Sequence, residues 1–253
     1  MRCLFCVCKE VKRLRLFNGD CLELMQDISD KSVDMILCDL PYGITECKWD
    51  SVISFESLWN QYRRIIKNNG AIVLFSVQPF TTKLIQSNLK AFRYCWYWKK
   101  NNKTGGAFAK VQPMRCIEDI CVFYYKAPRY NPQGLKKLAK PIIRDPEKQP
   151  NSIHRPLSKV SIQKYTNYPT HFLEFNNEAV DAKKRYHPTQ KPVKLLEYLI
   201  KTYTNEGETV LDNCMGSGST GVACVNTNRR FIGMELSDHY FNIAKERIES
   251  VML

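Results

Sequence analysis

Two short polar segments, each directly after an apolar run, constrain the fold most. The run from Val33 to Cys38 leads into Asp39-Leu40-Pro41-Tyr42, and the run from Glu208 to Leu211 leads into Asp212. A short apolar run bounded by turn residues is typical of a buried strand. Open α/β sheets bind ligands in the crevice at the carboxyl ends of their strands. The pattern therefore predicts an α/β fold with polar groups gathered at that edge.

The second segment is rich in glycine and reads Asp212-Asn213-Cys214-Met215-Gly216-Ser217-Gly218-Ser219-Thr220-Gly221. We expect its three glycines to let the backbone approach a bound molecule, and Ser219 and Thr220 to cap the following helix. Glu235 follows about twenty residues later, where a carboxylate can accept hydrogen bonds from ribose hydroxyls. Such a loop indicates a nucleotide-like ligand, and a tight turn without a ligand is the alternative.

Apolar spacing elsewhere alternates between strand-like and helix-like patterns. Phe55, Leu58 and Tyr62 lie at helical spacing, and Asn68-Asn69-Gly70 is expected to end that helix. The predicted strands are 33–39, 71–76, 92–99, 119–125, 208–211 and 230–236. The predicted helices are 55–67, 79–89, one that includes 193–200, one from the glycine loop to 225, and one that starts at Ser237. This alternation is typical of a doubly wound sheet.

Positive charge is concentrated in the middle of the chain. The formal net charge is +13 and the pI about 9.2, and residues 99–164 carry fifteen Lys plus Arg against four acids. Such a field attracts polyanions, although a solvated basic face is the alternative. Aromatic residues that can stack on bases are interleaved with these cations, namely Tyr97, Trp98, Phe108, Tyr130, Tyr165 and Tyr168. The combination favours a nucleic-acid partner.

From Lys126 to about Arg185 the periodicity fails, and seven prolines punctuate a basic, polar stretch. We interpret this stretch as an inserted recognition module, and a long disordered loop is the alternative.

The eleven cysteines are odd in number and scattered, which favours a reducing cytosol. Cys3, Cys6 and Cys8 resemble half a zinc site, but no matching pair with metal spacing follows, so no metal site is predicted. No targeting or membrane-spanning segment is expected.

Taken together, these motifs resemble the amino-group DNA methyltransferases that use S-adenosylmethionine, in the permuted order often called the β class. In that family an Asp-Pro-Pro-Tyr type motif comes first, a variable recognition region follows, and the cofactor glycine motif lies near the carboxyl end. The resemblance implies a Rossmann-like S-adenosylmethionine-dependent methyltransferase fold with a mostly parallel central sheet. Residues 1–125 would form the catalytic half, 126–186 the basic target-recognition insert, and 187–253 the cofactor-binding half.

The resemblance also implies roles for single residues. Asn18-Gly19-Asp20-Cys21 is similar to the segment that contacts the cofactor's adenine, and His187-Pro188-Thr189-Gln190-Lys191-Pro192 to the segment beside its methionine part. The implied cofactor-binding residues are Asp20, Cys21, Asp39, His187, Thr189, Lys191, Asp212, Cys214, Gly216, Ser217, Gly218, Ser219, Thr220, Glu235 and Leu236. Cys214 replaces the usual phenylalanine, so weaker cofactor binding is expected.

The implied reaction is methyl transfer to N6 of adenine in double-stranded DNA. Asp39 would accept one amine hydrogen and the backbone carbonyl of Leu40 the other, so that nitrogen approaches tetrahedral geometry. Leu40 replaces the usual proline, but its role uses the backbone. Pro41 would fix the turn and Tyr42 would stack on the base, which must first leave the duplex. No metal or covalent enzyme intermediate is required.

Two alternatives remain at this point. Cytosine N4 is the nearer one, because family members that act there more often carry serine at the Asp39 position. A catalytically silent DNA-binding protein that retains the fold is the other. The expected partners are double-stranded DNA, a possible second copy in a homodimer and a possible cognate restriction endonuclease. The expected location is the cytoplasm of a bacterial or phage-infected cell.

Overall fold

The computed structural model describes residues 13–43, 52–144, 160–176 and 190–252. Within these residues, eight strands form one sheet in the order β1-β10-β9-β2-β3-β5-β4-β8. The strands are β1 (Leu14–Asn18), β2 (Val33–Asp39), β3 (Ile66–Ser76), β4 (Phe92–Thr104), β5 (Arg115–Phe123), β8 (Phe172–Glu174), β9 (Thr209–Asp212) and β10 (Arg230–Glu235). The strands from β1 to β3 in this order run parallel, whereas β5 is antiparallel to β3 and β4. The predicted mostly parallel α/β sheet is confirmed.

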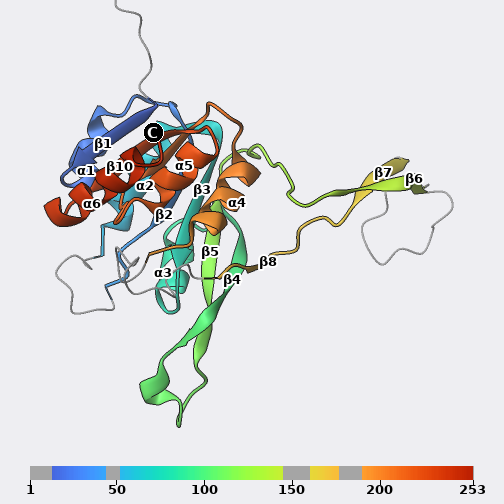
Figure 1. Ribbon diagram of the computed structural model, residues 1–253, viewed down its shortest axis with the longest axis horizontal. Coiled ribbons are helices and arrows are strands. Elements are labelled where there is room, and N and C mark those ends of the chain that lie inside the picture. Colours follow the sequence, from blue (N-terminus) through green and yellow to red (C-terminus); the bar gives the residue numbers. More distant parts are fainter. Residues whose placement is uncertain (1–12, 44–51, 145–159, 177–189, 253) are drawn as a thin grey trace, which may run out of the picture.

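Helices cover both faces of this sheet (Figure 1). One face packs against α4 (Val193–Tyr203), α5 (Ser219–Asn226) and α6 (Asp238–Glu249), and the other against α1 (Cys21–Leu24), α2 (Phe55–Ile65) and α3 (Phe80–Ser87). Met35 and Leu37 of β2 enter the core beneath α4, while Ile36 and Cys38 enter the core beneath α2. Because β2 is buried on both faces, its sequence is an almost unbroken apolar run. Two 3-10 helices are η1 (Met25–Asp27) and η2 (Gly106–Phe108).

The helix after Ser54 ends earlier than the sequence suggests. Ile66 already belongs to β3 and pairs with Val33 of β2, and Lys67 Nζ lies 2.7 Å from Asp34 Oδ1. A Cβ at Gly70 would lie 2.8 Å from the carbonyl oxygen of Asp34, so the close approach of β3 to β2 requires glycine there. The expectation that Asn68-Asn69-Gly70 ends the helix is therefore wrong, because β3 begins at Ile66 and these three residues lie within it, at a shift of its register with β2.

The hairpin of β4 and β5 is longer than its apolar pattern indicates. β4 continues to Thr104 and β5 begins at Arg115, whereas the predicted strands were 92–99 and 119–125. The additional residues are mostly polar and exposed, so they lack the apolar spacing that marks a buried strand. In Figure 1 this hairpin extends well beyond the sheet.

The described part of the insert contains strands. β6 (Lys136–Arg144) and β7 (Ser161–Thr166) form a two-stranded antiparallel sheet that projects from the body in Figure 1. β8 joins the central sheet, where Phe172 pairs with Tyr97 of β4. The alternative of a structureless loop is therefore wrong for these residues.

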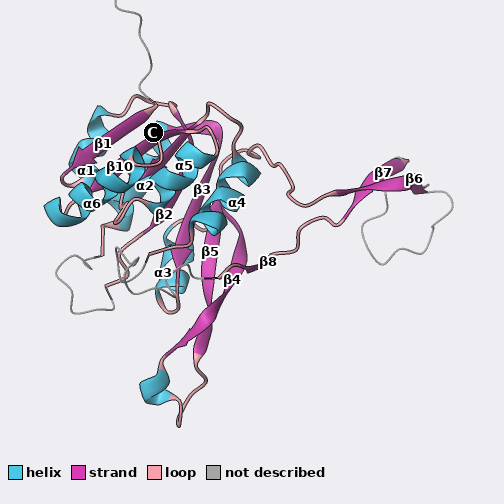
Figure 2. Ribbon diagram, in the orientation of Figure 1, coloured by secondary structure: helices cyan, strands magenta, loops and turns pink. Residues whose placement is uncertain are grey.

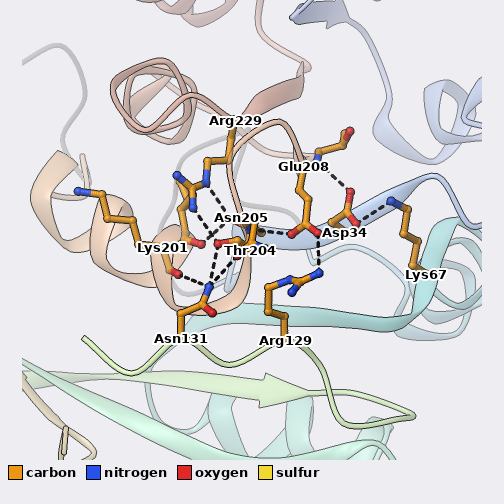
Figure 3. A network of polar contacts seen from close by, with 11 residues as sticks. Asp34, Lys67, Arg129, Asn131, Lys201, Thr204, Asn205, Glu208 and Arg229 are labelled. Atoms are coloured by element: carbon orange, nitrogen blue, oxygen red, sulfur yellow. Dashed lines mark hydrogen bonds and ion pairs between the residues drawn. The ribbon is translucent and has the colours of Figure 1, made fainter. Parts of the chain in front are cut away.

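The beginning of the insert is anchored at the amino edge of the sheet (Figure 3). Asn131 Nδ2 donates to the carbonyl oxygens of Lys201 and Thr204, each over 3.1 Å, and Arg129 pairs with Glu208 at 3.3 Å. Arg229 Nη2 donates to the carbonyl oxygen of Thr204 over 2.8 Å. These contacts satisfy carbonyl groups at the end of α4, where helices leave their last acceptors unpaired.

Candidate active site

Asp39, predicted as the catalytic acid, is the last residue of β2 and lies at the carboxyl edge of the sheet. Tyr42 donates its hydroxyl hydrogen to Asp39 Oδ1 over 2.5 Å, and Lys191 Nζ donates to Asp39 Oδ2 over 2.5 Å. Pro192 is the N-cap of α4, so Lys191 immediately precedes that helix. The side chain of Asp39 remains 24% exposed. The carboxylate is therefore held on two sides and still faces solvent.

Lys191 contacts a second carboxylate. Its Nζ lies 3.5 Å from Glu118 Oε2, while Lys100 Nζ lies 2.8 Å from Glu118 Oε1. Burial would raise the pKa of Glu118, but Lys191 and Lys100 outweigh it and lower that pKa. Burial likewise opposes the charge of Lys191, and Asp39 and Glu118 together raise its pKa. Both groups are therefore charged, and Asp39 belongs to a partly buried network of alternating charges.

Glu118 and Lys100 were not predicted as site residues. Glu118 lies on the same face of β5 as Ile120 and Val122, because these residues are two positions apart. Ile120 and Val122 belong to the core beneath α4. A carboxylate on the buried side of a strand requires a charged partner, so its place in this alternation was the available signal. Its Oε2 atom is buried and has no hydrogen-bond partner among the described residues.

The turn after Asp39 packs against α3. Leu40 is buried in the core beneath α2, and Gly43 has a φ of 65°, a left-handed conformation that favours glycine. The ring of Tyr42 lies 5.0 Å from the ring of Phe80, at an angle of 42°. Burial raises the pKa of Tyr42 well above its usual value, so its hydroxyl stays protonated and donates to Asp39. Phe80 is a further aromatic neighbour of this site that sequence reasoning missed.

The three glycines of the loop differ in function. Gly216 has a φ of 52°, and a Cβ there would meet no atom within 4 Å. Gly218 also has a positive φ, but a Cβ there would lie 3.0 Å from Ile248. At Gly221 the Cβ would lie 2.3 Å from Ile248 Cδ1. Only Gly216 therefore borders open space, and the expectation that Gly221 approaches a bound molecule is wrong because α6 packs against it.

The start of α5 also differs from the expected cap. Gly218 is the N-cap, and Ser219 and Thr220 are the first two residues of the helix. Thr220 Oγ1 donates to Asp212 Oδ2 over 2.6 Å, and Ser219 Oγ accepts from Arg247 Nη1 over 2.9 Å. The capping prediction is therefore wrong, because both hydroxyls bond to side chains of neighbouring elements instead.

Glu235 connects the glycine loop to the end of β10. Its Oε2 accepts from the N–H of Gly216 and its Oε1 from the N–H of Ser237, each over 2.9 Å. Burial raises the pKa of Glu235, although these two N–H groups oppose the shift. The backbone N–H of Gly19 donates to the carbonyl oxygen of Glu235 over 2.9 Å, which brings the turn before Asp20 to the same edge. Leu236 is 63% exposed there.

A buried polar cluster lies at the start of the loop. Tyr62 donates to Asn213 Oδ1 over 2.5 Å, and Asn213 Nδ2 lies 3.6 Å from Cys21 Sγ and 3.5 Å from Cys214 Sγ. The neighbouring thiol of Cys21 raises the pKa of Cys214, so Cys214 is neutral. Burial raises the pKa of Asp212 to about 6. Tyr62, which joins α2 to this cluster, was not predicted.

Two of the predicted cofactor residues, His187 and Thr189, lie outside the described residues, as do Cys3, Cys6 and Cys8. In the part of the chain that is described, no group of three or more His, Cys, Asp or Glu residues is placed to hold a metal ion. No helix in these ranges is long and apolar enough to cross a membrane.

The arrangement combines two chemical capacities at one edge. β2 and β9 are adjacent parallel strands, so Asp39 and the glycine loop emerge beside each other. Asp39 can accept a hydrogen bond from an incoming amine, because each carboxylate oxygen has two lone pairs. The open space at Gly216 and the carboxylate of Glu235 suit a ribose-bearing ligand.

Comparisons with curated proteins agree with this geometry. The chain is 27% identical over 250 residues to the type II methyltransferase M.HpaI of Haemophilus parainfluenzae. This alignment covers 93% of this chain and 74% of that protein. It is 26% identical over 268 residues to the type II methyltransferase M2.MboI of Moraxella bovis. That alignment covers 95% of this chain and 89% of the relative.

Solved structures show the same fold. The M1.HpyAVI–SAM complex superposes with a TM-score of 0.62 at 23% identity, over 92% of this chain and 99% of that chain. The cytosine-N4-specific PvuII DNA methyltransferase superposes with a TM-score of 0.68 at 14% identity, over 94% of this chain and 93% of that chain. The family model for N6 and N4 methyltransferases, described as DNA methylase, matches residues 33–246, and the chain therefore belongs to this DNA methylase family.

Proposed function

We propose that this chain is a site-specific DNA methyltransferase that transfers a methyl group from S-adenosylmethionine to N6 of adenine in double-stranded DNA. The observation that carries the proposal is the position of Asp39. Its carboxylate lies at the tip of β2, beside the glycine loop that follows β9, and it keeps an exposed fraction of 24%. A hydrogen-bond acceptor is thus available next to a candidate nucleotide site.

The residues at this edge fit the proposed cofactor. Gly216 leaves open space, and the carboxylate of Glu235 accepts backbone hydrogen bonds from Gly216 and Ser237 and retains capacity for a ribose hydroxyl. Asp39 and Lys191 present opposite charges, which match the ammonium and carboxylate of a methionine group. The proposed cofactor residues are those that the resemblance implies: Asp20, Cys21, Asp39, His187, Thr189, Lys191, Asp212, Cys214, Gly216, Ser217, Gly218, Ser219, Thr220, Glu235 and Leu236.

Bound S-adenosylmethionine supplies a methyl group made electrophilic by a sulfonium. The exocyclic amine of adenine is conjugated with the ring and is a poor nucleophile. Asp39 accepts one amine hydrogen and the carbonyl of Leu40 the other, which frees the nitrogen lone pair for attack on the methyl carbon. Methyl transfer would form the carbon–nitrogen bond as the carbon–sulfur bond of the cofactor breaks, and Asp39 would take up the amine proton. Positioning and electrostatics therefore carry the catalysis.

Tyr42 gives the extruded base an aromatic surface, and the buried ring of Phe80 packs behind it. Their rings lie 5.0 Å apart, and Tyr42 is fixed by its bond to Asp39. Stacking on such a surface offsets the few kcal/mol that leaving the duplex costs. The adenine assignment rests on Asp39, where cytosine-N4 enzymes more often carry serine, so N4-cytosine methylation is the second candidate.

The remaining partners are part of the same proposal. Double-stranded DNA suits the net charge of +13, and the relatives are named type II methyltransferases. A cognate restriction endonuclease and a homodimer are the further partners we propose. The proposed location is the cytoplasm of a bacterial or phage-infected cell.

The test is methyl transfer from labelled cofactor to unmethylated genomic DNA, followed by nucleoside mass spectrometry. The wild-type chain should yield N6-methyladenine, and Asp39→Asn should lower the rate by about 10² or more because the acceptor charge is lost. Asp119→Asn is the matched control, since Asp119 bonds Thr81 on the opposite face of the sheet. N4-methylcytosine would overturn the base assignment, and cofactor binding without any transfer would favour a silent DNA-binding protein.

A further inference from the structure

The hairpin of β4 and β5 leaves the sheet at the edge that holds Asp39. Asp39 pairs with Phe75 of β3, and Ser76, the last residue of β3, pairs with Asp119 of β5. Residues 115–118 of β5 therefore lie beyond the end of β3, on the side of the candidate active site. In Figures 1 and 2 the hairpin continues as a long arm with a loop and the short helix η2 at its tip.

The outer part of this arm, residues 101–117, is here called the distal arm. It contains the cations Lys103, Lys110 and Arg115 and no acidic residue. All three cations are exposed, and none of them has an ion-pair partner among the described residues. Two other cations of the hairpin form ion pairs, Lys99 with Glu174 and Lys100 with Glu118. Arg93, near the start of β4, instead donates to the carbonyl oxygens of Lys90 and Phe92 and lies over the ring of Tyr124. The part of the hairpin that lies farthest from the body thus carries three exposed cations without an ion-pair partner in the described part of the chain.

The distal arm also exposes apolar side chains. Phe108 is 58% exposed, Val111 81% and Met114 38%. They lie at or next to the turn, where Gly105 has a φ of 89° and allows the chain to reverse. Grouped apolar side chains that remain exposed are typical of an interaction site.

The length of the arm fits the dimensions of a duplex. From the pair of Trp98 with Glu118 to the pair of Thr104 with Arg115, β5 advances by three residues, with a register shift in β4. This stretch of the ribbon spans about 10 Å at about 3.3 Å per residue, close to the roughly 12 Å width of the major groove. A two-stranded ribbon is one of the shapes that the major groove admits. Cations along the ribbon can contact phosphates while an apolar tip contacts base edges.

We infer that the distal arm is a second DNA-binding element, separate from the insert at 126–186, with Lys103, Lys110 and Arg115 on phosphates and Phe108 in a groove. The inference rests on the proposed function. It commits to duplex DNA, because backbone phosphates can pair with the three cations that have no ion-pair partner among the described residues. The contacts of the arm with phosphates and with the groove do not involve the base that is methylated. The arm would therefore hold the DNA while that base is extruded at Asp39.

The experiment measures binding of a short duplex to the full chain at several salt concentrations. The arm variant is Lys103→Gln/Lys110→Gln/Arg115→Gln, and the matched control is Lys90→Gln/Lys201→Gln/Lys245→Gln, three exposed lysines outside the arm. Each phosphate contact contributes about 0.9 to the slope of log affinity against log salt, so the arm variant should lose about 2.7 of that slope. The control should retain the wild-type slope.

A second variant separates the apolar contact from the ionic ones. Phe108→Ala should weaken binding about 10-fold at every salt concentration and leave the slope unchanged, because a stacked or wedged ring releases no counterions. Cofactor binding should be unchanged in all variants, since the substituted side chains are exposed. This readout shows that each variant is folded.

The outcomes distinguish the two proposals. If the wild-type chain methylates DNA and the arm variant keeps the wild-type slope, the inference about the arm is wrong and the proposed function stands. If the wild-type chain binds DNA through the arm but transfers no methyl group, the proposed function fails alone. A change of sedimentation coefficient in the arm variant, with DNA binding unaltered, would assign the arm to self-association and overturn the inference.

Discussion

Lys191 Nζ lies 2.5 Å from Asp39 Oδ2, although 152 residues separate the two in the sequence. The pair connects the tip of β2 to the start of α4. Glu118 and Lys100 extend it into a network of four alternating charges. Removing one member of a buried ion pair leaves an uncompensated charge, so this network ties the geometry of Asp39 to residues on three other elements.

Lys191→Met should weaken cofactor binding about 10- to 100-fold, because a charge-assisted contact of about 1.5–3 kcal/mol is lost. Lys100→Met is the matched control. Lys100 bonds the other oxygen of Glu118 and forms no ion pair with Asp39, and its side chain is about as buried as that of Lys191. Isothermal titration calorimetry measures the affinity of both variants for S-adenosylmethionine. Equal losses of affinity in the two variants would contradict a direct role for Lys191 in cofactor binding.

Asp212 should make stability depend on pH between about 4 and 6. Burial raises its pKa from the usual 3.8 to about 6, so the folded state binds a proton that the unfolded state releases. The contribution of Asp212 to the free energy of unfolding is therefore greatest below the pKa of Asp212 in the unfolded state. It falls by up to about 3 kcal/mol as the pH rises through the pKa of Asp212 in the folded state.

Asp212→Asn removes this titration. An asparagine can still accept from the N–H of Cys214 through Oδ1 and donate to Thr220 Oγ1, so the fold should be retained. Urea unfolding at pH 4.5 and pH 7 should show a smaller pH dependence in the variant than in the wild type. Equal pH dependence in the two proteins would show that Asp212 is not the group responsible.

Gly221→Ala should destabilise the fold by about 1–3 kcal/mol, because the added Cβ overpacks the interface of α5 with α6. The Cβ would lie 2.3 Å from Ile248 Cδ1. The cost should shrink in an Ile248→Ala background, where that contact is absent. Gly216→Ala is the comparison, since a Cβ there meets no atom within 4 Å and only its φ of 52° opposes the change. An undiminished cost in the Ile248→Ala background would refute the packing explanation.

Cys214→Phe should tighten cofactor binding about fivefold, because roughly 1 kcal/mol of added apolar contact is gained. Cys214 is half-buried at the start of the glycine loop and packs beside Cys21. Cys214→Ser is the control for loss of the thiol alone. Unchanged affinity in the phenylalanine variant would count against packing of this position on the cofactor.

The sequence predicted the parts of the site that have local signals. The apolar run 33–38 made β2 recognisable, and the motif that follows made Asp39 and Tyr42 candidates at its end. The glycine loop, the strand that follows it and Glu235 at the end of that strand were also predicted from residues close together in the chain. Such signals succeed because the periodicities of strands and helices are properties of neighbouring residues.

Other features had no local signal. Lys191 was expected at the cofactor through its motif, but nothing in the motif placed it on Asp39 or paired it with Glu118. The polar outer half of the β4–β5 hairpin lacks apolar spacing, and its pairing depends on register with the partner strand. Helix α2 ends earlier than expected for the same reason, because pairing of Ile66 with Val33 extends β3.

The sequence by itself therefore determined the α/β class, the strand that carries Asp39 and the loop that carries Gly216, since each depends on local pattern and backbone preference. The tertiary structure alone decided which charges meet Asp39, why Gly221 must be glycine and how far the basic arm projects. Those features depend on contacts between residues up to 152 positions apart, and packing and strand register select such contacts only when the chain is folded.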